Sequence, residues 1–211
     1  MNWKLESLLR QLHTVNDNEY ESIMYAAAEE LMNKHIVRTD LHDFRLTEIE
    51  FYLYVPAVHE DVNTHCAPPQ LQFGRWYYNG FGLDISFGNS PNRISGGVLI
   101  RGLCQYGRAN LERQNILGSD SPFENRLGEI LRVLLVNSGE IGAPKKMDLI
   151  EYEDYEKTKI LSTPRINLRY LNVFGEAKYR FISHLVKKHK FPGRDVVRKM
   201  LSGADLERFD R

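Results

Sequence analysis

The segment 46–54 carries two carboxylates and two tyrosines at spacings that suit chemistry on a small planar ligand. Its sequence, Leu-Thr-Glu-Ile-Glu-Phe-Tyr-Leu-Tyr, alternates with the period of a β-strand. One face of that strand is expected to point into the core: Thr47, Ile49, Phe51 and Leu53. The other face would carry the acidic and aromatic side chains: Glu48, Glu50, Tyr52 and Tyr54.

Carboxylates beside flat aromatic rings suit a pocket that holds a planar ligand and activates a water molecule. Glu48 and Glu50 would lie roughly 7 Å apart, from a strand rise of about 3.3 Å per residue. The same segment also fits a plainer interpretation, a half-exposed strand whose acidic residues simply face solvent. The segment alone does not distinguish a ligand pocket from a solvent-exposed strand, so the rest of the sequence has to be considered.

The composition is typical of a globular protein with one domain, residues 1–211. With 211 residues, 42% of them hydrophobic and 11% aromatic, the chain can bury a sizeable core. Lys plus Arg and Asp plus Glu both number 28, so there is no overall basic excess of the kind that coats nucleic acid. A polyanionic partner would therefore have to bind through a local patch.

Cysteine content and hydropathy indicate a cytoplasmic protein without membrane association. Cys66 and Cys104 are too few for a disulfide framework, and no apolar run approaches the roughly 20 residues that span a bilayer. The first residues, Met-Asn-Trp-Lys-Leu-Glu, lack the apolar centre of a signal peptide.

The hydrophobic pattern predicts a mixed α/β (α+β) protein without internal repeats. Helices are expected over 3–13, from Asp17 or Asn18 to His35, from Ser121 toward Gly139, and from Pro192 onward. Strands are expected at 36–38, 44–55, 71–79, 82–88, 97–106, 147–152, 159–168 and 177–184. Residues 57–70 form a long loop of functional length, and residues 1–16 an N-terminal helical arm.

Three common enzyme motifs are absent. Gly80, Gly82 and Gly88 do not match G-x-G-x-x-G, and no helical pattern follows them. There is no Gly-Lys-Ser/Thr of a P-loop and no G-x-S-x-G nucleophile elbow. The sequence therefore argues against Rossmann, P-loop and α/β-hydrolase sites.

The long loop contains several potential metal ligands close together in the sequence: His59, Asp61, His65 and Cys66, with Glu60 between them. Spacings of two and four residues would let the loop wrap a zinc or iron ion. No C-x-x-C or H-E-x-x-H accompanies them, and loops of this composition are more often solvated. We expect no metal or other cofactor, and keep a metal-dependent hydrolase using the His59–His65 loop as one alternative.

Several short motifs resemble, in the right order, those of the alkyladenine (3-methyladenine) DNA glycosylases. The family has a helix followed by an L-V-R strand, and Ala28–Arg38 is similar to it. Its E-x-E-x-Y strand is matched by Leu46–Leu53, and its D-x-x-x-H loop by the loop that ends Asp61-Val62-Asn63-Thr64-His65. Leu83–Ser86 and Gly97–Leu103 are similar to its N-I-S and V-L-I-R-A strands. Thr163–Ile166 and Tyr179–Phe181 resemble its C-terminal P-R-I and W-R-F-Y. The resemblance spans most of the chain and implies a single domain with a curved antiparallel sheet and flanking helices.

The resemblance also implies roles for individual residues. Glu50 would activate a water for attack at C1′ of a nucleotide flipped out of the duplex, and Arg101 would lie beside this water and the backbone phosphate. Tyr52 and His65 would stack on the base to be excised, in keeping with the aromatic face predicted above. Tyr77 falls where the family places the side chain that wedges into the duplex.

The chain departs from the family at two places in the expected pocket. Asp84 stands where the family has the Asn of N-I-S, which puts a negative charge in place of an amide. Only residues 66–72 separate His65 from Phe73, where the family has a longer segment with T-x-R-N-x-x-M-F. Part of the pocket lining is therefore expected to be missing.

A basic run near the C-terminus is the best candidate for contacts with phosphate. Residues 178–199 hold a single acid, Asp195, among eight basic residues: Lys178, Arg180, Lys187, Lys188, Lys190, Arg194, Arg198 and Lys199. Such a run either binds a nucleic-acid backbone or is a solvated face.

The sequence thus leads to three functional hypotheses. The first is a hydrolase of base excision repair that removes alkylated or deaminated purines from damaged duplex DNA, without a metal and without a lyase step. The second is a non-catalytic module on the same fold that binds a nucleobase or nucleoside. The third is the metal-dependent hydrolase described above.

Overall fold

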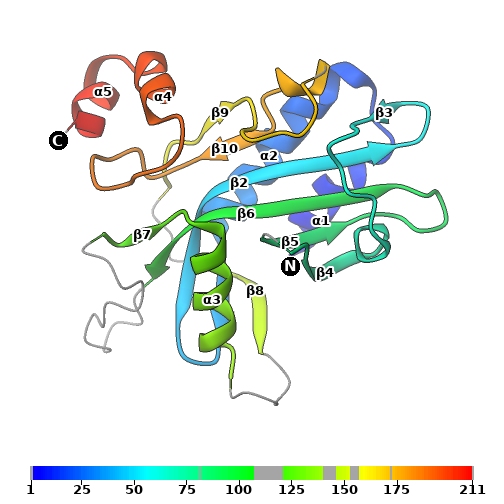
Figure 1. Cartoon of the computed structure of the whole chain (residues 1–211), viewed down its shortest axis with the longest axis horizontal. Helices are drawn as coiled ribbons and strands as arrows, with labels where there is room; N and C mark the ends of the chain where they lie inside the picture. Colours follow the sequence, from blue (N-terminus) through cyan, green and yellow to red (C-terminus); the bar gives the residue numbers. More distant parts are fainter. Residues whose placement is uncertain are drawn as a thin grey trace.

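The alternating segment forms most of β2 (Asp43–Val55), the longest strand among the residues described in a computed structural model. The structure describes residues 2–80, 82–106, 121–139, 146–152, 157–171 and 173–210. Over these residues it is a mixed α/β protein in which an antiparallel sheet curls into a half-barrel with helices around it (Figure 1). The α/β class expected from the hydrophobic pattern is therefore confirmed.

β2 lies at the centre of the sheet. The main path runs through six strands, in the order β4 (Phe73–Tyr78), β5 (Leu83–Phe87), β6 (Ser95–Tyr106), β2, β1 (His35–Thr39) and β8 (Met147–Glu151). Four short strands join it at the sides: β3 (His59–Glu60), β7 (Phe123–Glu124), β9 (Leu161–Thr163) and β10 (Arg180–Ile182). Since β6 and β10 both pair with the middle of β2, they flank its carboxylates on either side.

An irregularity shared by β2 and β6 bends the sheet. The register shifts on either side of the Glu48–Gly102 pair, so that Thr47 in β2 and Arg101 in β6 have no residue opposite them. Extra residues of this kind bend a strand and increase its twist. Figure 1 shows β2 and β6 turning together from the vertical to the horizontal part of the sheet.

The same irregularity corrects one sequence prediction. The core residues of β2 are spaced by two except at this point, where the spacing is three: Phe44, Leu46, Ile49, Phe51 and Leu53. Thr47, expected in the core with Ile49, instead lies beside Glu48, because both side chains face Gly102. A Cβ at Gly102 would stand 2.8 Å from the Thr47 hydroxyl, so a glycine is required there.

The N-terminal helices cover one side of the sheet. α1 (Trp3–Gln11) and α2 (Tyr20–Lys34) are joined through the short 3-10 turn η1 (Asp17–Glu19). Leu5 and Leu9 of α1 are buried in the main hydrophobic core with Leu31 of α2. The segment expected as an N-terminal arm therefore packs into the body of the protein.

Three elements differ most from their predicted bounds. The helix expected from Ser121 begins later, as α3 (Leu127–Asn137), because Phe123 and Glu124 pair with β6 instead. The carboxylate of Glu124 accepts hydrogen bonds from two successive backbone N–H groups, which hold this turn in an extended form. The strands expected over 159–168 and 177–184 shorten to β9 and β10.

The C-terminal helices form a smaller unit on the side of β10. α4 (Arg194–Met200) begins two residues later than the helix expected from Pro192, after Gly193 as its N-cap, and α5 (Gly203–Asp210) follows it. They bury a separate hydrophobic cluster: Ile182, Leu185, Phe191, Val197, Leu201 and Phe209. No helix in the described part of the chain is both long and apolar enough to cross a membrane.

Candidate functional site

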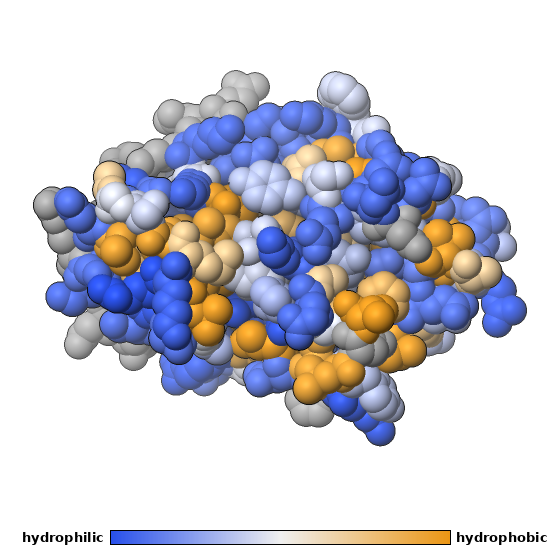
Figure 2. Space-filling view, turned by 90° about the horizontal axis from the view of Figure 1, so that it is seen from above, coloured by the Kyte–Doolittle hydropathy of each residue, from blue (hydrophilic) through white to orange (hydrophobic). Residues whose placement is uncertain are grey.

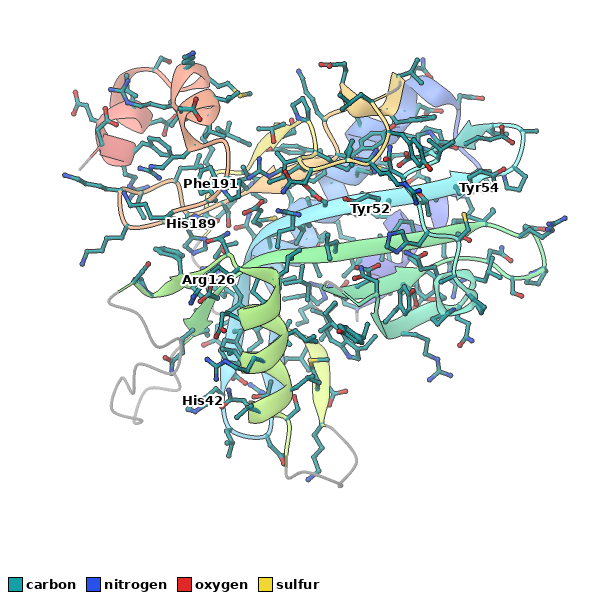
Figure 3. All side chains as sticks on the ribbon, in the orientation of Figure 1. His42, Tyr52, Tyr54, Arg126, His189 and Phe191 are labelled. Atoms are coloured by element: carbon teal, nitrogen blue, oxygen red, sulfur yellow. The ribbon has the colours of Figure 1, made fainter. Side chains whose placement is uncertain are left out.

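A cavity of about 610 Å³ opens beside the middle of β2. It is lined by side chains from β2, β5, β6 and α3, and from the segments 62–70, Asn79 and 166–170: Tyr52, Val62, Asn63, Thr64, His65, Gln70, Asn79, Asp84, Leu99, Arg101, Leu127, Ile166, Asn167, Leu168, Arg169 and Tyr170. Figure 3 shows Tyr52 on the horizontal part of β2, between β6 and the loop that follows β9. The volume is in the range of pockets for small ligands.

Four of the six predicted site residues line this cavity: Tyr52, His65, Asp84 and Arg101. They come from positions far apart in the sequence, and the antiparallel sheet brings three of them together. His65 reaches the cavity from the long loop and is exposed to solvent at its mouth. The structure therefore places these four residues around one cavity, and the roles implied for them remain predictions.

Glu50 is completely buried and does not line the cavity itself, but it contacts side chains that do. Its Oε2 accepts hydrogen bonds from the Tyr52 hydroxyl at 2.9 Å and from Arg101 Nη1 at 3.4 Å. Its Oε1 accepts one from the backbone N–H of Ile166 at 3.1 Å. Each of these three donors belongs to a residue that lines the cavity.

The surroundings of Glu50 change its pKa in opposite directions. Burial raises the pKa of Glu50, while the Arg101 guanidinium and the hydrogen bonds from Ile166 and Tyr52 act to lower it. Burial, and then the neighbouring Glu50 charge, raises the pKa of Tyr52, so this hydroxyl stays protonated and donates. A carboxylate held in this way can accept a proton more readily than an exposed one.

Glu48, the other carboxylate of the face, has a different environment. Its Oε1 accepts hydrogen bonds from Arg101 Nε at 3.1 Å and Arg180 Nε at 2.8 Å. Its Oε2 accepts one from Asn125 at 2.7 Å. Glu48 is therefore a structural anchor that fixes Arg101.

Arg165 supports Tyr52 from the protein side. Its guanidinium carbon lies 4.6 Å from the centre of the Tyr52 ring, a distance suited to a cation–π contact. Arg165 Nη1 donates to Asp61 Oδ2 at 2.6 Å and to the Phe51 carbonyl at 3.1 Å, with both charged side chains fully buried. The ring of Tyr52 is thereby fixed in orientation before any ligand arrives.

These contacts form one continuous buried network with equal numbers of opposite charges. Its basic members are Arg101, Arg165 and Arg180, and its acidic members are Glu48, Glu50 and Asp61. Buried charges of one sign would each cost several kcal/mol, so such a set is stable only when paired as it is here.

Asp84 is the one acidic residue among the described residues that line the cavity. It is 2% exposed, and its oxygens accept hydrogen bonds from the amides of Gln70 at 3.2 Å and Asn79 at 3.1 Å. Burial raises the pKa of Asp84 to about 7, against the lowering effect of these two amides. Its environment thus differs from that of Glu48, which two arginines neutralise.

Tyr77 does not line the cavity. It lies half-buried on β4, opposite Asp84 on β5. The residues at the mouth with exposed hydrophobic surface are instead Val62 and Tyr170, with Leu171 next to them. Figure 2 shows hydrophobic residues exposed in separate groups between hydrophilic ones on the face seen from above.

The potential metal ligands of the loop are not brought together. His59 is buried among aromatic rings, 4.2 Å from Tyr20 and 4.5 Å from Phe174 between centroids, and Asp61 is paired with Arg165. Within the described residues, no group of three or more His, Cys, Asp or Glu side chains could hold a metal ion. The geometry therefore gives no support to a metal site at His59, Asp61, His65 and Cys66.

The basic run 178–199 divides between structural and exposed residues. Arg180 is buried against Glu48, and Arg194 donates to the carbonyls of Val186, His189 and Phe209. Arg198 pairs with Asp210. The exposed basic residues that remain are Lys178, Lys187, Lys188, Lys190 and Lys199, so the expected phosphate patch is smaller than the sequence suggests.

Several residues of the site were not singled out from the sequence. Arg165 stood in a quoted motif without a role, Arg180 was considered for a role only as part of the basic run, and Asn125, Gln70 and Asn79 carried no signal at all. Their positions depend on pairings between distant segments, such as the register that sets Arg180 opposite Glu50. No protein-family model matches the sequence, and the comparison with curated proteins finds no match.

Proposed function

We propose that the protein hydrolyses the N-glycosidic bond of a modified purine nucleotide in DNA, on a sheet of the alkyladenine DNA glycosylase type. In this reaction a water oxygen forms a bond to C1′ while the bond from C1′ to the base nitrogen breaks. Glu50 takes the proton of the water, and the base departs with the electron pair of the broken bond.

One observation carries this proposal: among the described residues, each group that donates a hydrogen bond to the Glu50 carboxylate belongs to a residue of the cavity wall. A flipped base needs a flat ring on which to stack, and Tyr52 supplies one that Arg165 holds in place. A carboxylate that acts as a general base must lie close to the reacting atoms. The Glu50 carboxylate accepts a hydrogen bond from the hydroxyl of the same tyrosine, Tyr52.

Charge at the mouth of the cavity suits a nucleotide rather than a free apolar ligand. Arg169 is exposed at the rim and lies 5.2 Å from the ring of Tyr170, measured from its guanidinium carbon to the centroid. Asn63 holds this rim by two hydrogen bonds to the backbone of Tyr170, at 3.0 and 3.1 Å. A phosphate beside a flipped nucleotide would meet Arg169 here.

A second function, base binding without cleavage, is favoured by a different observation. Glu50 does not itself line the cavity, is fully buried, and has hydrogen bonds on both oxygens. If these bonds persist when a base enters, no water reaches the carboxylate and the cavity acts as a receptor for a nucleobase or nucleoside.

The experiment that decides between the two is incubation of the purified protein with duplexes carrying hypoxanthine, ethenoadenine or 3-methyladenine. Release of free base and formation of abasic sites supports the hydrolase. Tight binding of a free purine with no base release from any duplex supports the receptor. An undamaged duplex is the substrate control, and a Glu6→Gln variant on α1 is the protein control because Glu6 pairs with Arg10 away from the cavity.

A further inference from the structure

Asp84 differs from the other buried carboxylates near the cavity because it has no basic partner among the residues that the structure describes. Glu48 and Glu50 share Arg101, and Asp61 is paired with Arg165. Each Asp84 oxygen accepts a single hydrogen bond from the described residues, in both cases from a neutral amide. A carboxylate oxygen can accept two, so Asp84 keeps acceptor capacity in the cavity wall.

The two amides around Asp84 are fixed in orientation. The side-chain oxygen of Gln70 accepts from the Ala67 N–H at 3.3 Å, and that of Asn79 accepts from the Gly82 N–H at 2.8 Å. Both NH₂ groups must therefore point toward Asp84, and neither amide can rotate to present its oxygen to the carboxyl group. The arrangement stabilises an anion at Asp84.

Space is kept free around this carboxyl group by Gly97 on β6. A Cβ at this position would stand 3.0 Å from Asp84 Oδ2 and 3.0 Å from Gln70 Nε2. Any larger residue would therefore crowd Asp84 against its amide partner.

The cavity is thus acidic inside and basic at its mouth. Arg101 is neutralised by two carboxylates, which leaves Asp84 as the unbalanced charge of the interior, while Arg169 stands at the rim. A ligand whose phosphate lies at the rim and whose inner end is positively charged would match both Arg169 and Asp84 in charge.

From this arrangement we infer that Asp84 selects purines that carry a positive charge on the ring, the N-alkylated purine nucleotides, over neutral purines of similar size such as hypoxanthine. This inference rests on the proposed function and narrows its substrate class. A hydrogen bond or contact between ionised partners is roughly twice as strong as one between neutral groups. A cationic purine also leaves as a neutral base when its bond to C1′ breaks, so it needs no proton donor in the site.

The pKa of Asp84, raised by burial to about 7, agrees with such a role, because a bound cation would favour the ionised form. Among the described charged or titratable residues, Tyr77 on β4 lies opposite Asp84, and Arg101 on β6 and His65 on the loop line the same cavity. Tyr77 carries no charge near neutrality, since burial and then the Asp84 charge raise its pKa.

The test compares Asp84→Asn with the unmodified protein on two substrates. One is duplex DNA treated with dimethyl sulfate, which carries 7-methylguanine and 3-methyladenine, and the other is a duplex with hypoxanthine. We expect the ratio of methylated-base release to hypoxanthine release to fall at least about tenfold in Asp84→Asn, by loss of an ionic contact. Asp148→Asn, on the exposed side of β8, is the matched control and should keep the original ratio.

An unchanged ratio in Asp84→Asn would overturn the inference, as would a selective loss of hypoxanthine release, which would make Asp84 a proton donor to neutral bases. If no duplex loses a base, the hydrolase proposal fails while selectivity is still measurable by binding. Calorimetry with 1-methyladenosine, a cation, and adenosine should then show tighter binding of the cation, with the difference lost in Asp84→Asn. Equal binding of both nucleosides by the unmodified protein would contradict the inference independently of catalysis.

Discussion

Arg101 joins the two carboxylates of β2, donating from Nε to Glu48 Oε1 at 3.1 Å and from Nη1 to Glu50 Oε2 at 3.4 Å. It occupies the bulged position of β6, where it has no residue opposite it in the register. The bend of the sheet and the geometry of the candidate site therefore depend on the same residue.

Replacing Arg101 with Met should destabilise the protein strongly. The change leaves Glu50 without its basic partner and Glu48 with only one, and breaking a buried ion pair costs about 3 to 5 kcal/mol. Urea denaturation measures the free energy of unfolding. Arg132→Met is the matched control, since its exposed pair with Glu129 should contribute less than about 1 kcal/mol. Equal losses in the two variants would show that the buried network does not stabilise the fold.

Tyr52 should contribute to base binding through its ring and to the site through its hydroxyl. Tyr52→Ala is expected to weaken base binding by about 1 to 3 kcal/mol through lost stacking. Tyr52→Phe retains the ring and removes only the hydrogen bond to Glu50, so it should keep most of the affinity. Fluorescence titration with a duplex containing ethenoadenine measures both. Similar losses in the two variants would place the hydroxyl, rather than the ring, at the base.

Asp84 should make stability depend on pH in a defined direction. Its pKa is about 7 in the folded protein and about 3.9 in an unfolded chain, so between these values the folded state holds a proton that the unfolded state has lost. The free energy of unfolding therefore falls as pH rises from 4 to 7, by up to roughly 4 kcal/mol from this group. Thermal unfolding at pH 5 and pH 8 should show a larger decrease for the unmodified protein than for Asp84→Asn. Parallel behaviour of the two proteins would mean that Asp84 is not buried as described.

Binding to DNA should depend on salt through the exposed lysines of the C-terminal run. Each phosphate contact contributes a slope of about 0.9 in a plot of log affinity against log salt concentration. The combined Lys187→Gln, Lys188→Gln and Lys190→Gln variant should reduce this slope by up to about 2.7. Lys157→Gln, near Glu29 on α2, is the control. A slope that is the same in the triple variant would assign phosphate binding to another surface, such as the rim near Arg169.

The centre of the fold could be predicted from the sequence because its signals are local. Alternation over 46–54 identifies a strand with one acidic face, and Pro56 marks its end. Glu50 and Tyr52 consequently occupy the face that was predicted for them.

The parts that could not be predicted depend on contacts between distant residues. The bulge at Thr47 appears only when β2 is paired with β6, and the role of Arg180 only when β10 is placed beside Glu48. The helix start at Ser121 was wrong because Glu124 satisfies two backbone N–H groups in an extended turn. His59 was considered as a metal ligand because the sequence does not reveal that Tyr20 and Phe174 enclose it.

The most direct test of the central claim is the single-turnover rate of base release by Glu50→Gln from a duplex that the unmodified protein cleaves. A general base contributes about 10² to 10⁴ in rate, so the rate constant should fall by at least about 100-fold while circular dichroism at the assay temperature shows a folded protein. Glu48→Gln should lower stability, because two arginines share that carboxylate, but should reduce the rate less. Full activity in Glu50→Gln would contradict the assignment of Glu50 as the residue that activates water.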